Sequence, residues 1–282
     1  MRRLAARAAR LATVPAGGPT WLVCRRMRCV VARMLVVGVF SMLVAACGSG
    51  QPSGRGPSTA GSRPVAPAAG EPPIGGHSLV AVPGQSVTAE VRPRLIEIYR
   101  RPAAGRPIRA MANPVESGIP LVFLVKQARA GWLEVYLPVR PDGATGWIRA
   151  SHVTLKHDPY HVRISLGGHR LTVTKLGRVV DRQPIGVGDV ATPTPRGVYF
   201  VTALYRLIDP TGPFGPYAFG LSGFSNVLRS FGGGPGQLAI HGTNDPGGIG
   251  SNVSHGCIHV TNREITRLAK VLPLGTPVQI AS

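Results

Sequence analysis

The apolar residues of this 282-residue chain are gathered in short runs that Gly, Pro and Asn interrupt. Apolar runs of this length, bounded by turn residues, are typical of β-strands rather than of packed helices. The 37 Gly and 27 Pro residues also favour turn-rich structure over a helical bundle. The sequence therefore predicts a mainly β protein.

The runs fall into two groups, which predict β domains at residues 78–157 and 158–282. In the first group we expect strands at Leu79–Val82, Leu95–Tyr99, Leu121–Lys126, Trp132–Leu137 and Trp147–Arg149. In the second we expect strands at His161–Leu166, Leu171–Lys175, Arg178–Asp181, Val198–Leu204 and Leu238–Ile240. Gly167-Gly168 and Gly177 indicate hairpin turns. The segment Gly212–Gly236 is rich in Gly and Pro and predicts a long loop over a site.

One helix is predicted near the C-terminus. Thr261 and Glu264 fit a capping box, in which a threonine hydroxyl accepts from the backbone three residues on. An apolar stripe at helical spacing follows, made of Ile265, Leu268, Ala269 and Leu272. Pro273 and Gly275 are expected to end the helix.

The N-terminal segment 1–46 is typical of an export signal. Four arginines precede the 13-residue apolar run Met34–Ala46, which is shorter than the about 20 residues that a spanning helix needs. The end of this run, Val44 to Gly48, resembles the lipobox of bacterial lipoproteins. That resemblance implies cleavage before Cys47 and a lipid on its sulfur, which anchors the protein to the outside of the cell membrane. The alternative is an ordinary signal peptide with an incidental cysteine.

Residues 47–77 are mostly Gly, Pro, Ser and Ala and predict a disordered linker. The formal net charge is +20, but residues 1–46 hold eight of the 32 basic residues and none of the 12 acidic ones. The remaining chain keeps a net charge of about +12, which indicates an anionic neighbourhood. Its basic residues are not interleaved with aromatic ones, so we expect no nucleic-acid partner.

The cysteines single out one thiol. Cys24 and Cys29 lie in the predicted signal segment, and Cys47 is the predicted lipidation site, so Cys257 has no partner for a disulfide. A lone cysteine in an exported chain is a candidate reactive group. A thiol becomes a good nucleophile when an imidazole takes its proton, giving a thiolate–imidazolium pair.

Two histidines near Cys257 are candidate bases. The predicted strand Leu238–Ile240 delivers His241 into a Gly-rich loop, and His255 lies two residues before the cysteine. Gly256 between them indicates a tight turn, whose backbone N–H groups can stabilise an oxyanion. We therefore assign His255-Gly256-Cys257 to the oxyanion pocket and His241 to the base, although the thiol–imidazole chemistry alone does not choose the histidine. Zinc binding by these histidines and Cys257 has the wrong spacing, and no metal or other cofactor is expected.

The motifs His241-Gly242-Thr243-Asn244 and Ser254-His255-Gly256-Cys257 resemble the L,D-transpeptidase catalytic domain, the YkuD-like family. The resemblance extends to Thr192–Gly197 and Leu221–Phe224 and covers about residues 161–281. It implies a β-sandwich that follows an SH3-like barrel, because Gly131–Pro138 and Gly143–Ile148 resemble the end of a bacterial SH3-like domain. Trp132 and Trp147 of that domain are expected to be core residues.

The resemblance also implies the reaction. Cys257 attacks a peptidoglycan stem tetrapeptide, D-alanine leaves, and a neighbouring stem resolves the thioester into a 3→3 cross-link. It implies that His241 moves the proton and the Gly242 carbonyl orients its ring. Ser254, His255 and Gly256 then shape the pocket, and a carbapenem acylates the thiol. The alternatives are an L,D-carboxypeptidase and a non-catalytic wall-binding lipoprotein.

Three residues are candidate substrate contacts, namely Thr243, Asn244 and His259. The family usually has arginine two residues after the cysteine, where this chain has His259. A guanidinium holds a carboxylate at any working pH, whereas an imidazole is mostly neutral at pH 7. This departure predicts weaker carboxylate recognition and more pH-dependent activity.

Overall fold

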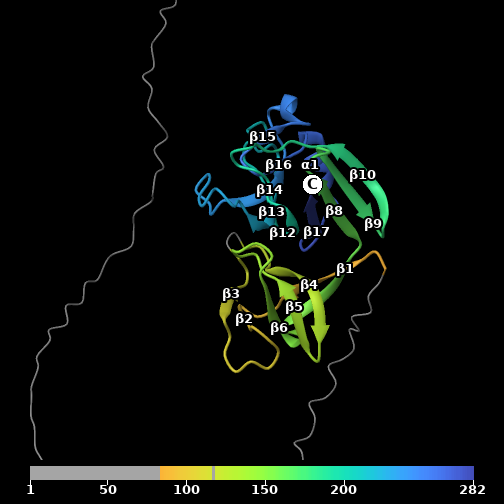
Figure 1. Ribbon diagram of the computed structural model, residues 1–282. Coiled ribbons are helices and arrows are strands. Elements are labelled where there is room, and N and C mark those ends of the chain that lie inside the picture. The colour runs from red at the N-terminus through yellow and green to blue at the C-terminus, as the bar shows by residue number, and fades with distance from the viewer. Residues whose placement is uncertain (1–82, 116–117) are drawn as a thin grey trace, which may run out of the picture. The chain divides into compact units, whose positions relative to one another are not determined.

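The structure is a computed structural model that describes residues 83–115 and 118–282 (Figure 1). All of these residues belong to one compact unit that spans Pro67–Ser282. The predicted signal peptide 1–46 with Cys47, the linker 47–77 and the strand Leu79–Val82 lie outside the described residues. Within the described ranges, no helix has the length and apolar character needed to cross a membrane.

The first half of the described chain forms a five-stranded antiparallel sheet with the strand order β6-β5-β4-β1-β7. A hairpin of two further strands joins β6 through the bridge Tyr99–Trp147. The seven strands are β1 (Ser86–Val91), β2 (Leu95–Ile98), β3 (Arg109–Ala112), β4 (Val122–Arg129), β5 (Trp132–Tyr136), β6 (Thr145–Arg149) and β7 (Val153–Asp158). Trp132 is buried, as predicted, whereas Trp147 is only half-buried.

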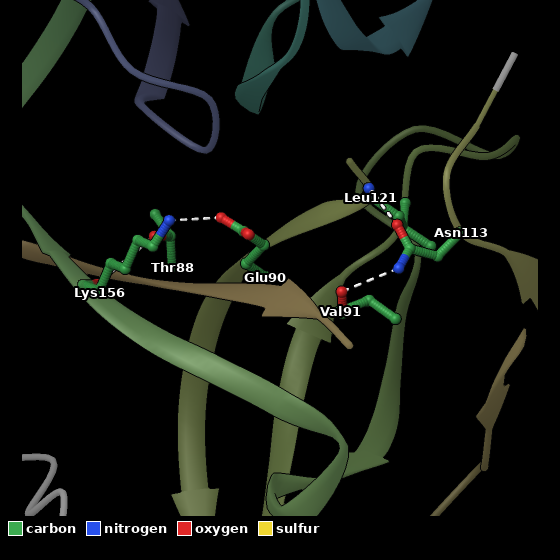
Figure 2. Close-up of polar contacts among 6 residues, drawn as sticks. All are labelled: Thr88, Glu90, Val91, Asn113, Leu121 and Lys156. Carbon is green, nitrogen blue, oxygen red and sulfur yellow. Dashed lines mark hydrogen bonds and ion pairs between the residues drawn. The ribbon is translucent and has the colours of Figure 1, made fainter. Parts of the chain in front are cut away.

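Asn113 ties the β2–β3 hairpin to the five-stranded sheet (Figure 2). Its Nδ2 donates to the Val91 carbonyl and its Oδ1 accepts from the Leu121 N–H, each at 2.9 Å. At the edge of the sheet, Lys156 of β7 pairs with Glu90 of β1 (Figure 2). The core of this body is made of apolar side chains from β1, β2, β4 and β5.

The second half forms an eight-stranded sheet with the order β10-β9-β8-β17-β12-β13-β14-β16. Its elements are β8 (Tyr160–Ser165), β9 (Arg170–Lys175), β10 (Arg178–Pro184), β12 (Gly197–Arg206), β13 (Tyr217–Phe224), β14 (Gln237–His241), β16 (Ile258–His259) and β17 (Pro277–Ala281). The helix α1 (Asn262–Leu268) packs Ile265 and Leu268 onto the core of this sheet. A short parallel pair, β11 (Val187–Gly188) and β15 (Asn252–Ser254), lies beside it. The prediction of a mainly β protein with one helix is confirmed for the described residues.

The predicted hairpins form where local sequence allows a tight turn. Strands β8 and β9 alternate buried and exposed positions and pair from Tyr160↔Lys175 to Ser165↔Arg170. Between β9 and β10, Leu176 and Gly177 both have positive φ, at 52° and 76°. Two left-handed residues in succession are the geometry of the hairpin turn whose twist matches that of the strands.

Two predictions about this half are wrong. The segment Gly212–Gly236 is not one long loop, because β13 occupies Tyr217–Phe224 in the middle of the sheet. Small residues there are packing positions: a Cβ on Gly223 would lie 2.2 Å from the Tyr199 ring. The helix α1 ends at Leu268, earlier than Pro273 and Gly275 predicted. Leu272 is still buried, but a turn brings it to the core.

Strand β12 contributes side chains to the cores of both halves. Tyr199 and Val201 belong to the core of the eight-stranded sheet, whereas Phe200 is fully buried in the core of the first body. This follows from the two-residue alternation of a strand between two apolar layers. The buried Thr276 hydroxyl also donates to Asp158 at 2.7 Å. The two halves therefore share packed surface.

We expect Phe200→Ala to destabilise the protein by about 3–5 kcal/mol, because it leaves a cavity where the two halves meet. Urea unfolding followed by tryptophan fluorescence measures the change, since the first body contains Trp132 and Trp147. A loss below about 1 kcal/mol would contradict this packing role. Ile208→Ala, which removes a fully exposed apolar side chain, is the control.

Candidate active site

The parallel pairing of β14 and β16 brings the two chemistry-bearing segments together. Its register places Ile240 opposite Ile258 and His241 opposite His259. Both isoleucines are fully buried in the core, so the side chains of the two histidines emerge on the other face. Cys257 directly precedes β16 and lies two residues before His259, so it shares this face. Strand alternation therefore predicts that its side chain lies diagonal to His241. Among the described residues, no hydrogen bond joins these two side chains.

Hydrogen bonding fixes the tautomer of His241. Its Nδ1 lies 2.6 Å from the Gly242 carbonyl oxygen, and a carbonyl only accepts. Nδ1 therefore carries the proton, and Nε2 keeps the lone pair that a general base needs. This is the ring orientation by the Gly242 carbonyl that the family resemblance implies.

Other rings enclose His241. The edge of Phe214 contacts it with ring centroids 4.9 Å apart, and the His259 ring lies at 4.6 Å. Burial, together with the charge of His259, lowers the pKa of His241 to about 4. The imidazole is therefore neutral at pH 7 and able to accept a proton.

The thiol of Cys257 is neutral at rest. The residue is half-buried, and burial raises the pKa of its thiol, which a backbone hydrogen bond from Ala239 partly offsets. Burial thus disfavours charge on both partners. A neutral thiol beside a neutral imidazole differs from the thiolate–imidazolium pair that we expected.

The turn before Cys257 is built around the Ser254 hydroxyl. It donates to the Cys257 carbonyl at 2.5 Å and accepts from the Gly256 N–H at 3.1 Å. Gly256 has φ +112°, a conformation that side-chain-bearing residues rarely adopt. Its amide is therefore occupied and supports the turn instead of facing an oxyanion. Among the described residues, the Cys257 amide has no hydrogen-bond acceptor, which leaves it as the donor for an oxyanion pocket.

Two buried threonines donate hydrogen bonds to backbone carbonyls of this turn. The sequence analysis did not assign them this role. Thr194 donates to the Gly256 carbonyl at 2.9 Å and accepts from the Gly188 N–H at 2.8 Å. Thr192 and the backbone of Asp189 lie against the Ser254 carbonyl, at 3.2 and 2.9 Å. These contacts join residues about sixty positions apart, so the local Thr192-Pro-Thr-Pro pattern does not reveal them.

Asn262 holds the segment after His241. Its Oδ1 accepts from the Thr243 N–H at 2.9 Å, and a Cβ on Gly242 would lie 2.2 Å from the same oxygen. Only glycine therefore fits at Gly242. This role was not predictable from the local sequence, in which Asn262 only follows the capping residue Thr261 of the predicted helix. The predicted cap itself is confirmed, because Thr261 accepts from the Glu264 N–H at 3.2 Å.

The remaining candidates lie in different settings. His255 is exposed and stacks on Phe231, with ring centroids 5.1 Å apart, so its ring contacts a loop rather than His241. This geometry favours His241 over His255 as the base. Thr243 is buried, and its hydroxyl accepts from the Asp245 N–H, whereas Asn244 is exposed. Burial lowers the pKa of His259, with Asp245 acting in the opposite direction.

The comparisons with known proteins agree on one family. The family described as YkuD, L,D-transpeptidase catalytic domain, matches residues 159–280. Over 122 residues the chain is 39% identical to the putative L,D-transpeptidase YkuD of Bacillus subtilis and 40% identical to that of Bacillus licheniformis. Each match covers 43% of this chain and 66% of the relative.

Among solved structures, the chain is similar to L,D-transpeptidase 3 from Mycobacterium tuberculosis in complex with a faropenem-derived adduct. The sequence identity is 17%, the match covers 51% of this chain and 76% of that chain, and the TM-score is 0.37. The family match and the two curated relatives therefore show that residues 159–280 are similar to L,D-transpeptidase catalytic domains. The chain spans 66% of the length of the two curated relatives.

The neutral state of His241 predicts acid sensitivity. Its pKa falls from an ordinary value of about 6.5 in the unfolded chain to about 4 in the fold, so the unfolded chain binds more protons between these values. Stability is therefore fully present above pH 6.5 and falls as the pH approaches 4. The loss from this residue amounts to about 3 kcal/mol.

Urea unfolding of the protein and of His241→Gln, at pH 7 and at pH 4.5, measures this loss. We expect the variant to lose markedly less stability on acidification than the parent protein. His157→Gln, which removes an exposed histidine of β7, should behave like the parent. Parallel pH dependence in all three proteins would mean that His241 is not buried in its neutral form.

Proposed function

We propose that the protein is an L,D-transpeptidase that forms 3→3 cross-links between peptidoglycan stem peptides through a thioester on Cys257. The observation that carries the proposal is the β14–β16 register, which brings His241 beside the strand that directly follows Cys257, in a part of the chain that matches this family's model. The relatives named as L,D-transpeptidases support the same reaction class.

In the proposed first half-reaction, Sγ of Cys257 attacks the donor carbonyl while Nε2 of His241 takes the thiol proton. The tetrahedral oxyanion is held by the Cys257 amide. The C–N bond to the terminal D-alanine then breaks, and the imidazolium returns its proton to the leaving amine. A thioester remains on the enzyme.

In the second half-reaction, an amine of a neighbouring stem attacks the thioester carbonyl and loses its proton to His241. The C–S bond breaks, the amide cross-link forms, and the thiol regains its proton. If water takes the place of the amine, the product is a shortened tripeptide and the enzyme is an L,D-carboxypeptidase. His259, neutral at pH 7 because burial lowers its pKa, offers the substrate a hydrogen bond rather than a charge.

We further propose that the protein acts outside the cell membrane, anchored by a lipid on Cys47, with the linker 47–77 as its tether. The lipobox-like sequence and the single thiol of the described residues support this location. We interpret the first body, residues 78–157, as an SH3-like domain, in line with its Gly-Trp motifs. The anchor is tested by following cleavage of the precursor. We expect globomycin to block cleavage of the parent protein, and we expect the Cys47→Ala precursor to remain uncleaved.

The main prediction concerns covalent inhibition. Protein expressed without residues 1–46 should gain one carbapenem adduct, at Cys257, because the strained lactam carbonyl replaces the donor carbonyl. Intact-mass spectrometry should show this adduct in the parent and none in Cys257→Ala. No adduct in the parent, or an adduct that survives in Cys257→Ala, would contradict the assignment.

The base is tested by rate. We expect His241→Ala to slow acylation by about 100-fold or more, which is the usual contribution of a positioned general base. His259→Ala should slow it by less than about tenfold, since that ring only neighbours His241. Equal effects would mean that the base is wrongly assigned. With a defined tetrapeptide substrate, cross-linked dimers indicate transfer, whereas tripeptides alone indicate hydrolysis.

A further inference from the structure

The loop between β13 and β14, residues 225–236, carries a ring onto the catalytic motif. Phe231 of this loop stacks on His255, with the ring centroids 5.1 Å apart and the planes 30° apart. Phe231 stands at a hairpin turn in which it exchanges both backbone hydrogen bonds with Gly234. His255 belongs to the turn that supplies the nucleophile, so the position of this loop bears on the shape of that turn.

The loop holds few contacts of its own away from its base. Ser225 and Gly236 pair through a backbone hydrogen bond of 2.8 Å, and the Ser225 hydroxyl accepts from the Val227 and Leu228 amides. Three carbonyl groups of the loop accept hydrogen bonds from outside the loop. A side chain from the first body supplies the donors.

That side chain is Arg140, in the turn between β5 and β6. Its guanidinium donates to three loop carbonyls, those of Ser225 at 2.7 Å, Leu228 at 3.1 Å and Pro235 at 3.0 Å. Its Cζ also lies 4.9 Å from the centre of the Phe224 ring. A planar group with five donors suits this arrangement, and a lysine would be able to satisfy it only in part.

Asp142, two residues further on, holds the strand from which the loop departs. Its carboxylate accepts from the Phe224 N–H, at 3.0 and 3.2 Å from the two oxygens, and from the Tyr199 hydroxyl at 3.2 Å. One turn of the first body therefore fixes both the start of the loop and its interior. These contacts join residues more than eighty positions apart.

We propose that Arg140 is a positioning residue for the active site, which acts by holding loop 225–236 closed so that Phe231 stays against His255. The proposal rests on the proposed transpeptidase function and adds a role for the first body in it. Arg140 does not touch the reacting atoms. Its removal frees the loop, releases the His255 ring and loosens the turn that presents Cys257 and its amide.

The test compares five variants of the purified protein: Arg140→Ala, Arg140→Lys, Phe231→Ala, the double variant Arg140→Ala/Phe231→Ala and the control Arg229→Ala. Arg229 is an exposed arginine of the same loop, so the control removes an equal charge without the three carbonyl contacts. The first measurement is amide hydrogen exchange of residues 225–236. We expect exchange about tenfold faster in Arg140→Ala and unchanged in Arg229→Ala, since charge-assisted hydrogen bonds hold the loop.

The second measurement is turnover of the donor tetrapeptide. Arg140→Ala and Phe231→Ala should each lower kcat by about tenfold, with a smaller change in KM, because the turn that presents Cys257 is affected. The double variant should be no slower than either single variant, since both changes act on one contact. Arg140→Lys should restore part of the activity, which a general loss of stability does not explain.

Two outcomes overturn the proposal. One is unchanged loop exchange in Arg140→Ala, and the other is a full additive loss in the double variant. The rate at which iodoacetamide labels Cys257 does not depend on the peptide substrate. It therefore tests the role of Arg140 even if the proposed function fails. If the parent does not turn over the tetrapeptide, a labelling rate that changes alike in Arg140→Ala and Phe231→Ala still supports the role of Arg140. An unchanged labelling rate in that case overturns it.

Discussion

The parallel pairing of β14 with β16 is the constraint on which the site depends. Because side chains alternate along a strand, a slip of one residue would turn His241 into the core and bring Ile240 to the surface. The burial of Ile240 and Ile258 therefore determines which side chains of β14 and β16 face the site, as well as how the two strands pair. The surrounding contacts hold this pairing at both ends: Thr194 fixes the turn that enters β16, and Asn262 fixes the segment that leaves β14.

Burial also decides the protonation state of the two reacting groups. It lowers the pKa of the imidazole and raises that of the thiol, so both changes favour the uncharged pair. The thiolate is the form that oxidants attack, and the proposed location outside the cytoplasm lacks the reducing systems that repair it. A thiol that ionises only when it transfers its proton during attack remains protected between turnovers. The low basicity of His241 in turn favours return of the proton to the leaving amine.

Local sequence patterns predicted much of the fold, since strand alternation, hairpin turns and the Thr261 cap depend on residues near one another. The strand β13 was missed because its glycines are selected by packing against Tyr199, a contact with a distant strand. The same distinction applies to the site. His241, Ser254 and Cys257 lie in short motifs, whereas Thr194, Asn262 and Phe231 act across long separations in the chain. The sequence analysis also missed that the Cys257 thiol and the His241 imidazole are both neutral, because their burial depends on the whole fold.

The packing between the two halves bears on what the first body does. A domain that serves only as a spacer is expected to meet its neighbour through a small polar surface and to move against it. Here Phe200 of β12 fills the core of the first body, and Thr276 donates to the buried Asp158. Such contacts leave little freedom for rigid-body motion, because a packed core has one low-energy arrangement. The turn that carries Arg140 and Asp142 therefore keeps a fixed place against Phe224 and the loop 225–236.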